Sequence, residues 1–178
     1  NITTYIEPKV IEIGGCEIML VPWICEQNEE QTFVMADKTS AQILFGHLEL
    51  AGYEMYKGGI IDHGISDQWL KKFDLVCSGH YHHKSRNGNI NYLGTAYEIT
   101  WSDYNDQKGF HIFDTVTREL EFIPNPHQLF HKVWYDDTDL DMTGLLEQCK
   151  QFDQFAGCSV KVITNTGCHR PSSFRFRR

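Results

Sequence analysis

The organisation of this chain turns on one stretch, Asp74-Leu75-Val76-Cys77-Ser78-Gly79-His80-Tyr81-His82. Its apolar part predicts a short buried strand, and Gly79 lets the backbone turn sharply just before His80. In an extended or turning segment, residues i and i+2 can point to the same side, so His80 and His82 can converge on one metal ion or on two adjacent ions. Neutral imidazole is a common ligand of zinc, manganese and iron. The stretch therefore predicts a strand that ends in a metal-binding loop.

A second stretch of the same kind lies upstream. Ala41-Gln42-Ile43-Leu44-Phe45 predicts a buried strand, and Gly46-His47 follows it directly. Between the two stretches, Ser66-Asp67-Gln68-Trp69-Leu70 begins like a capped helix. The order of strand, histidine loop, helix, strand and histidine loop predicts a crossover unit. Both loops then lie at one edge of the sheet, where open α/β sheets bind their ligands.

The simpler interpretation of each motif is a loop with exposed histidines and no ligand. Two such motifs at consecutive strand ends favour a metal site, with His47, His80 and His82 as ligands. Gly46, Gly79 and His83 are predicted to support these ligands without binding the metal themselves. The other histidines are predicted to have no part in the site: His63 as a solvated loop residue, His111 as a surface group, and His127 and His131 as structural residues.

The flanking segments predict a mixed α/β (α+β) protein. The predicted elements are a hairpin over 10–13 and 17–21, a short helix over 27–37, β-rich segments at 89–94 and 96–101, a hairpin over 109–114 and 119–124, a helix near 143–152 and a strand at 159–163. Pro124-Asn125-Pro126 is a stiff break that predicts a domain boundary. We expect one domain over 1–126 and the start of a second, small α/β domain over 127–178.

Composition limits the possible settings of the protein. The chain has 178 residues, of which 41% are hydrophobic, and this is enough for a core. No apolar run approaches the roughly 20 residues of a membrane span, so we expect a cytoplasmic protein with no membrane partner. The six cysteines form no C-x-x-C pair and predict reduced thiols.

The charge of the chain bears on its partners. A formal net charge of -8 weighs against wrapping of nucleic acid by bulk positive charge. It leaves open a nucleic-acid enzyme whose metal ions supply local positive charge, assisted by Lys84, Arg86 and Lys108.

Several of these motifs together resemble a known family. Leu44-Phe45-Gly46-His47 and the 74–82 stretch are similar to the last two histidine motifs of the calcineurin-like metallophosphoesterases. The continuation Asn91-Tyr92-Leu93-Gly94-Thr95-Ala96-Tyr97-Glu98 and the hairpin over 108–124 resemble SbcD-type nuclease subunits of DNA recombination and repair, in particular those of T-even bacteriophages. The likeness runs from about Val10 to about Thr164 and is strongest over 43–126.

The resemblance implies a fold, a cofactor and partners. It implies part of a metallophosphoesterase β-sandwich flanked by helices, followed by the start of an accessory (cap) domain. It implies two manganese ions, one bound by His47 and His80 and the other by His82, and hydrolysis of DNA phosphodiesters at ends or hairpins. The implied partners are DNA, an SbcC-type SMC-like ATPase subunit and, when the protein is complete, a second copy in a homodimer.

The chain also departs from this family. The family's earlier Asp-x-His, Gly-Asp and Asn-His-Asp motifs are absent before His47, so the family's catalytic histidine has no counterpart here. We therefore expect a carboxyl-side portion of a longer protein, with weak metal binding and no turnover by this chain alone.

The final residues, 165–178, turn basic and break the family's pattern. A frame change or an artificial end explains this tail, and a nucleic-acid-contacting tail is the functional alternative. Two other functions stay open for the whole chain. One is a calcineurin-like phosphoesterase for phosphoproteins or nucleotides, and the other is a non-catalytic binding or assembly fragment.

Overall fold

The computed structural model describes residues 2–136, 138–164 and 173–175. The chain divides into two compact units, Asn1–Asn125 and Pro126–Arg178, and each is described by itself. The basic tail predicted at 165–178 lies outside the described residues except for 173–175.

The first unit is built on a six-stranded sheet with the strand order β1-β2-β3-β6-β8-β7. The four inner strands run parallel to one another, and an antiparallel strand closes each edge. The strands are β1 (Lys9–Ile13), β2 (Cys16–Val21), β3 (Ile43–Gly46), β6 (Leu75–Ser78), β7 (Ser85–Asn87) and β8 (Ile90–Tyr92). The predicted strands that precede the two histidine motifs are confirmed.

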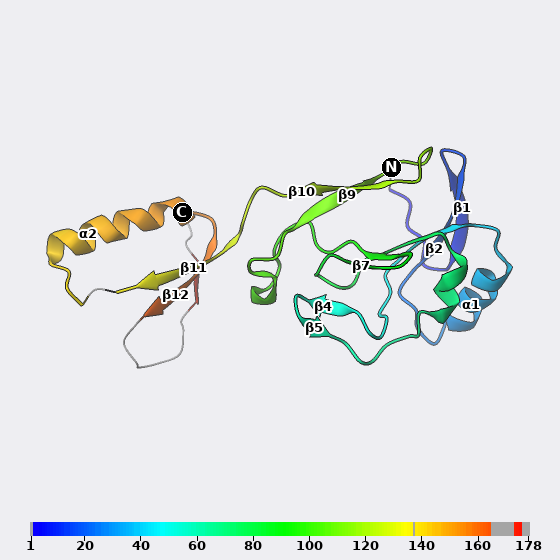
Figure 1. The fold of residues 1–178 in the computed structure, drawn as a ribbon, viewed down its shortest axis with the longest axis horizontal. Coiled ribbons are helices and arrows are strands. Elements are labelled where there is room, and N and C mark those ends of the chain that lie inside the picture. The colour runs from blue at the N-terminus through cyan, green and yellow to red at the C-terminus, as the bar shows by residue number, and fades with distance from the viewer. Residues whose placement is uncertain (1, 137, 165–172, 176–178) are drawn as a thin grey trace. The chain divides into compact units, whose positions relative to one another are not determined.

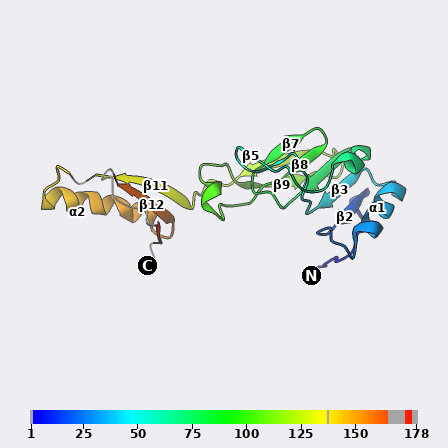
Figure 2. The same cartoon turned by 90° about the horizontal axis from the view of Figure 1, so that it is seen from below.

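The first face of the sheet packs against the helical segments of the unit. Helix α1 (Glu29–Lys38) and the 3-10 helix η1 (Gln68–Lys72) contribute Ala36 and Leu70 to a core that contains Leu44 and Val76 of the central strands. Figures 1 and 2 show α1 beside β2. Leu44, Leu70 and Val76 are all fully buried, so this face holds the main core of the unit.

The opposite face of the sheet meets a hairpin. Strands β9 (Gly109–Phe113) and β10 (Leu120–Pro124) pair antiparallel, as the alternating sequence predicts. Phe113 packs edge-on against Phe45 of β3, with ring centroids 5.5 Å apart. Ile18 and Ile43 are buried on this face and join the same apolar cluster. Successive side chains of the central strands thus point to opposite faces of the sheet, as in any pleated strand.

The first hairpin forms around Gly14 and Gly15. Both glycines have positive φ, at 57° and 79°, which is the backbone conformation of a tight two-residue hairpin turn. The register pairs Ile13 with Cys16 directly across the turn. The predicted hairpin and the predicted short helix after it are both confirmed.

The connection between β3 and β6 differs from the prediction. It contains a short antiparallel pair, β4 (Glu54–Tyr56) and β5 (Gly59–Ile60), and then η1 in place of an α-helix. Gly52, Gly58 and Gly64 all adopt positive φ, so the chain turns repeatedly before it reaches Ser66. The side chain of Asp67 makes no capping hydrogen bond, and η1 ends after five residues.

The segment after the second histidine loop also differs in part. The predicted β-rich segment at 89–94 contains β8, which pairs parallel with β6 on one side and antiparallel with β7 on the other. Residues 96–101 form bends that lead into the 3-10 helix η2 (Trp101–Asp103), and they form no strand. Glu98 and Asp103 are both buried here. Burial of acidic side chains requires polar partners, which a loop can supply more flexibly than a strand.

The second unit contains a parallel strand pair bridged by a helix. β11 (Phe130–Tyr135) pairs parallel with β12 (Ser159–Thr164), and β13 (Ser173–Arg175) adds to β12 antiparallel. Helix α2 (Met142–Lys150) and the 3-10 helix η3 (Gln151–Phe155) connect the two parallel strands. Asp141 caps α2 by accepting a hydrogen bond from the N–H of Gly144 at 2.8 Å. The predicted helix and strand are confirmed, whereas β11 was not predicted.

The chain is thus an α+β protein, as the sequence predicts, with most of its described regular structure in sheets. None of the helices formed by the described residues has the length and apolar character needed to cross a membrane.

Candidate functional site

The site lies where three parallel strands end together. In the sheet register, Val21 of β2 pairs with Gly46 of β3, which pairs with Ser78 of β6. The residues that follow these three ends are therefore brought to one sheet edge, as the crossover argument requires. His47 comes directly after β3, and His80 comes two residues after the end of β6.

His47 and His80 form a compact aromatic cluster with Trp23. The two imidazole rings have centroids 5.3 Å apart, and Trp23 lies 6.0 Å from His47 and 4.9 Å from His80. Trp23 is 45% exposed, so the cluster opens to solvent. Neither imidazole forms a hydrogen bond with any other residue that the structure describes. Both rings thus keep nitrogen atoms available as ligands.

The backbone around this pair is shaped for close approach. His80 has φ of 80°, a left-handed conformation that few non-glycine residues adopt and that is concentrated at functional sites. A Cβ atom added to Gly79 would lie 2.8 Å from Nδ1 of His47, so a side chain there would displace the imidazole. At Gly46, such an atom would lie 3.2 Å from the carbonyl oxygen of Val21. Because Gly46 and Gly79 have no side chains, the His47 imidazole and the loop that carries His80 can pack closely against the backbone.

The environment of His80 favours its neutral form. Partial burial lowers the pKa of the His80 imidazole, and the neighbouring His47 lowers it further. Glu49 acts in the opposite direction and raises that pKa to a smaller extent. Only the deprotonated nitrogen of an imidazole can bind a metal, so this environment suits a ligand.

The third predicted ligand, His82, has a different partner. Its Nδ1 atom lies 3.2 Å from each of the two carboxylate oxygens of Asp103. The side chain of His82 is 31% exposed, whereas that of Asp103 is 1% exposed. The structure thus brings His47 and His80 together and pairs His82 with a buried carboxylate from η2.

Asp103 belongs to a buried network of charges. Lys108 donates hydrogen bonds from Nζ to Asp103 at 3.1 Å, to Asp106 at 2.9 Å and to the carbonyl oxygen of His82 at 2.8 Å. Burial raises the pKa of the Asp103 carboxyl, but hydrogen bonds from the N–H groups of Thr100 and Ile99, together with Lys108, outweigh this effect and lower that pKa to about 2. The carboxylate therefore stays ionised in the folded protein.

The network shows the surroundings of two residues, Lys108 and His83, for which the sequence predicts a supporting role near the metal ions. Lys108 was predicted to add positive charge beside the metal ions, but its side chain is only 4% exposed and is paired with two carboxylates. Its charge is thus neutralised inside the protein. His83 is predicted to support the ligands, and its Nδ1 lies 3.0 Å from Asp106 while its Nε2 lies 3.6 Å from Glu54.

Sequence reasoning missed the places of Trp23, Asp103 and Lys108 at this edge. A signal for Trp23 was present, because Pro22-Trp23 follows a predicted strand just as the two histidine motifs do. A signal for Asp103 was also present, since Thr100 and Asp103 have the spacing of a capping box and form one in the structure. No local pattern marks the buried position of Lys108, because that position depends on the contact of its Nζ with the carbonyl oxygen of His82, 26 residues away in sequence.

Neither His63 nor His111 of the first unit makes a ring contact with His47 or His80. His63 is 67% exposed and lies 3.3 Å from Glu49, as expected of a solvated loop residue. His131 lies on β11 and its ring packs against Phe155. His111 was predicted to be a surface group, but it is half-buried beside Phe122 with ring centroids 5.0 Å apart, and burial lowers the pKa of its imidazole.

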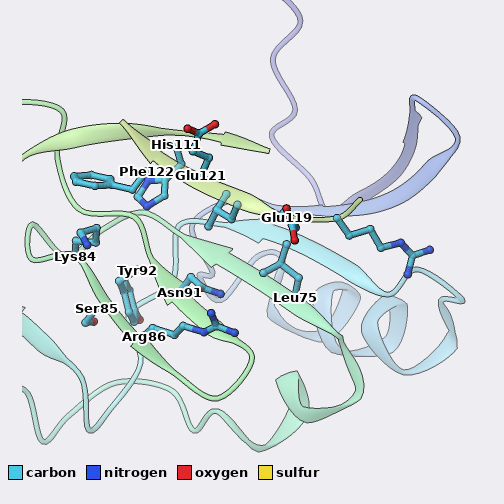
Figure 3. Close-up of a pocket in the computed structure, with 12 residues that line it drawn as sticks. Leu75, Lys84, Ser85, Arg86, Asn91, Tyr92, His111, Glu119, Glu121 and Phe122 are labelled. Atoms are coloured by element: carbon cyan, nitrogen blue, oxygen red, sulfur yellow. The ribbon is translucent and has the colours of Figure 1, made fainter. Parts of the chain in front are cut away.

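A groove of about 710 Å³ separates the hairpin β9–β10 from the adjacent strands of the sheet (Figure 3). His111 and Phe122 line its hairpin side, and Lys84, Arg86 and Tyr92 line the other side. Lys84 lies over the ring of Phe122, with 4.3 Å from Nζ to the centroid. The groove also contains Arg118, Glu119 and Glu121, so its charges are mixed. Mixed charge does not favour a phosphate backbone in this groove.

The donor chemistry of the edge fits a transition metal, but the number of donors does not complete a site. Imidazole nitrogens suit manganese, zinc and iron, and those of His47 and His80 are free of hydrogen bonds to described residues. Within the described part of the chain, no three histidine, cysteine, aspartate or glutamate side chains are grouped so that they hold one ion together. The described residues of this edge thus supply two imidazole donors but no complete set of ligands for one ion.

Comparisons with known proteins show that the chain is similar to nuclease subunits. It is 36% identical over 163 residues to exonuclease subunit 1 of Enterobacteria phage T4, a match that covers 92% of this chain and 45% of that protein. It is 27% identical over 106 residues to the SbcD component of the nuclease SbcCD of Staphylococcus epidermidis, a match that covers 53% of this chain and 28% of that protein. No model of a known protein family matches the chain.

The chain spans slightly less than half the length of the phage relative and under a third of the length of the bacterial one. Its resemblance to SbcD-type subunits, which the sequence motifs predict, is confirmed by these similarities.

Proposed function

We propose that this chain forms part of an SbcD-type nuclease subunit, a metal-dependent phosphodiesterase that acts on DNA. The observation that carries the proposal is the pair of imidazoles of His47 and His80 at the carboxyl edge of a parallel sheet. The pair occurs in a chain that is similar over 92% of its length to a phage exonuclease subunit. The same argument favours DNA over phosphoproteins or nucleotides as substrate.

His47 and His80 are proposed to bind one metal ion and His82 a second, with manganese as the metal. When bound, two such ions supply Lewis-acid activation of a phosphodiester and of the attacking water. The residues of this chain hold and orient the nitrogen donors, and Trp23 covers one side of the imidazole pair.

The chain alone is proposed to bind manganese weakly and to lack nuclease turnover. Its described residues offer imidazoles without a carboxylate placed between two ions. Two divalent ions a few ångströms apart repel each other strongly, and a bridging carboxylate normally offsets this repulsion. Calorimetric titration of the 178-residue chain with MnCl2 checks the proposal, and tight binding of two ions would contradict it.

The second unit is proposed to be the start of an accessory (cap) domain. The proposed partners are DNA, an SbcC-type SMC-like ATPase subunit and a second copy of the complete protein. Support comes from the bacterial relative, which is named as one subunit of the nuclease SbcCD.

A chimaera tests the nuclease function directly. The matched region of the phage T4 subunit is replaced by this chain, and hydrolysis of linear duplex DNA is measured with manganese. We expect His47→Gln and His80→Gln each to lower the rate by about 100-fold or more, since each removes a metal ligand.

His63→Gln serves as the matched control, because His63 is an exposed histidine of the same unit that lies outside the imidazole pair. Equal cleavage by all three variants would refute the proposed role of the pair. Activity on small phosphoesters without activity on DNA would favour another phosphoesterase. A chimaera that binds DNA or the ATPase subunit but cleaves neither substrate would favour a non-catalytic role.

A further inference from the structure

His82 is held by a carboxylate that is itself held from several sides. Nδ1 of His82 lies 3.2 Å from both oxygens of Asp103, and this carboxylate is almost fully buried. The N–H groups of Ile99 and Thr100 donate to its Oδ2 at 2.9 and 2.8 Å. Lys108 donates to its Oδ1 at 3.1 Å. Asp103 therefore has little freedom to rotate or to move away from the imidazole.

These contacts determine which nitrogen of His82 carries the proton. A carboxylate that accepts hydrogen bonds from a lysine and two backbone N–H groups presents acceptor oxygens to any further neighbour. Nδ1 of the neutral His82 ring must then be the donor, so Nε2 is the unprotonated nitrogen. Nε2 has no hydrogen bond to any residue in the described part of the chain, and the His82 side chain is partly exposed.

The adjacent histidine is held differently. His83 has carboxylates near both ring nitrogens, with Asp106 at 3.0 Å from Nδ1 and Glu54 at 3.6 Å from Nε2. Lys108 joins Asp103 to Asp106 and also holds the carbonyl oxygen of His82. One lysine thus organises the carboxylates behind two consecutive histidines. Of these two rings, only that of His82 has a nitrogen with no carboxylate of a described residue within 4 Å.

We infer that Asp103, anchored by Lys108, is a positioning residue that fixes His82 in the tautomer whose Nε2 is free to bind a cation. The inference rests on the proposed function only in naming a metal ion as that cation. A metal-bound histidine commonly donates its other ring N–H to a carboxylate, which fixes the tautomer and the ring orientation. In this chain the supporting carboxylate comes from η2, 21 residues after the histidine that it orients.

The tautomer is directly measurable without any metal. Long-range 1H–15N correlation spectra of the 178-residue chain, recorded where the imidazoles are neutral, distinguish a protonated Nδ1 from a protonated Nε2. The His82 signals are assigned by their loss in His82→Gln. We expect the wild-type ring to carry its proton on Nδ1, and a proton on Nε2 would overturn the inference.

Asp103→Asn is expected to reverse this tautomer. Its side-chain carbonyl oxygen takes the place of Oδ2 and accepts from the N–H groups of Ile99 and Thr100. Its NH2 group then replaces Oδ1 and faces Nδ1 of His82 as a donor, which moves the ring proton to Nε2. Asp114→Asn is the matched control, because Asp114 also accepts two backbone N–H groups but has no hydrogen bond or ion pair with any histidine that the structure describes. An unchanged His82 tautomer in a folded Asp103→Asn variant would overturn the inference.

Manganese binding provides a second readout in the phage T4 chimaera. We expect Asp103→Asn to weaken manganese binding by about 10- to 100-fold, as loss of an orienting partner commonly does. Asp114→Asn is expected to leave manganese binding unchanged. Equal affinities of the two variants would overturn the positioning role.

The spectra test the inference about His82, and the nuclease assay tests the proposed function, so the two can be refuted separately. If the chimaera neither binds manganese nor cleaves DNA, the proposed function fails, whereas the His82 tautomer in the 178-residue chain still decides the inference. If Asp103→Asn does not fold, the wild-type spectrum decides it, and Lys108→Met gives a second comparison. In Lys108→Met, Asp103 keeps its backbone donors, so the ring proton is expected to stay on Nδ1. A proton on Nε2 in that variant would contradict the inference.

Discussion

The ionised carboxylate of Asp103 is expected to make the first unit sensitive to acid. Its pKa in the folded protein is about 2, below the ordinary value of 3.8. A carboxyl whose pKa is lower in the folded state binds its proton more readily when unfolded. Its contribution to stability is therefore complete above the unfolded pKa and is lost as the pH falls through the folded pKa. The shift corresponds to about 2 kcal/mol of unfolding free energy.

The assay is urea unfolding from about pH 6 to about pH 2, followed by tryptophan fluorescence. Trp134→Phe is used as the background, because the other three tryptophans, Trp23, Trp69 and Trp101, all lie in the first unit. Between about pH 6 and about pH 2, we expect the free energy of unfolding to fall by about 2 kcal/mol more in the Trp134→Phe background than in the same background with Asp103→Asn. Other carboxylates titrate in both proteins, so their contributions cancel in the difference.

Near neutral pH the same variant is expected to lower the free energy of unfolding by about 2 kcal/mol, the stabilisation that the lowered pKa of Asp103 represents, because Lys108 keeps Asp106 as a charged partner. Asp114→Asn is the control, since Asp114 is exposed and contacts no lysine. If wild type and Asp103→Asn lose stability in parallel between pH 6 and pH 2, the assignment of an ionised, buried Asp103 is refuted.

Two further predictions concern the backbone and the thiols. Gly64→Ala is expected to destabilise the first unit by about 2–3 kcal/mol in urea unfolding, because Gly64 has φ of 116° and a Cβ atom there would lie 2.6 Å from the carbonyl oxygen of Glu49. Gly58→Ala, at φ of 81° with no atom within 4 Å, should cost only about 1 kcal/mol, and equal losses would contradict this reading. Iodoacetamide should modify the exposed Cys25 at once and the buried Cys77 only on unfolding, since burial raises the pKa of the Cys77 thiol to about 12. Rapid labelling of Cys77 in the folded protein, detected by peptide mass spectrometry, would count against its core position.

The strands that carry the histidine motifs were predictable because their signals are local. A short apolar run followed by glycine and histidine predicts both a buried strand and the turn at its end, and β3 and β6 have these features. The double glycine at 14–15 likewise predicts a hairpin whose turn needs positive φ at both positions.

The crossover and the strand after the second motif were less predictable. Ser66-Asp67 has the composition of a helix start, but the side chain of Asp67 makes no capping hydrogen bond and the backbone is extended again at Phe73, so only the five-residue 3-10 helix η1 forms. β8 runs parallel to β6 because Ile90 and Asn91 find partners there, a choice that depends on residues 14 positions upstream. Strand pairing is a property of the assembled sheet, so local sequence patterns do not specify it.

For the candidate site, the residue types and the strand ends were readable in the sequence, and these indicated that His47 and His80 meet. The sequence did not indicate which ring nitrogens of the histidines have carboxylate partners. His82 and His83 are adjacent and chemically identical, yet Asp103 leaves one nitrogen of His82 free while Asp106 and Glu54 flank both nitrogens of His83. The folded chain makes this distinction because the segment 103–108, which carries Lys108 and its two carboxylates, contacts His82 and His83 across 21 to 26 residues of sequence. Burial then keeps Lys108 paired with both carboxylates.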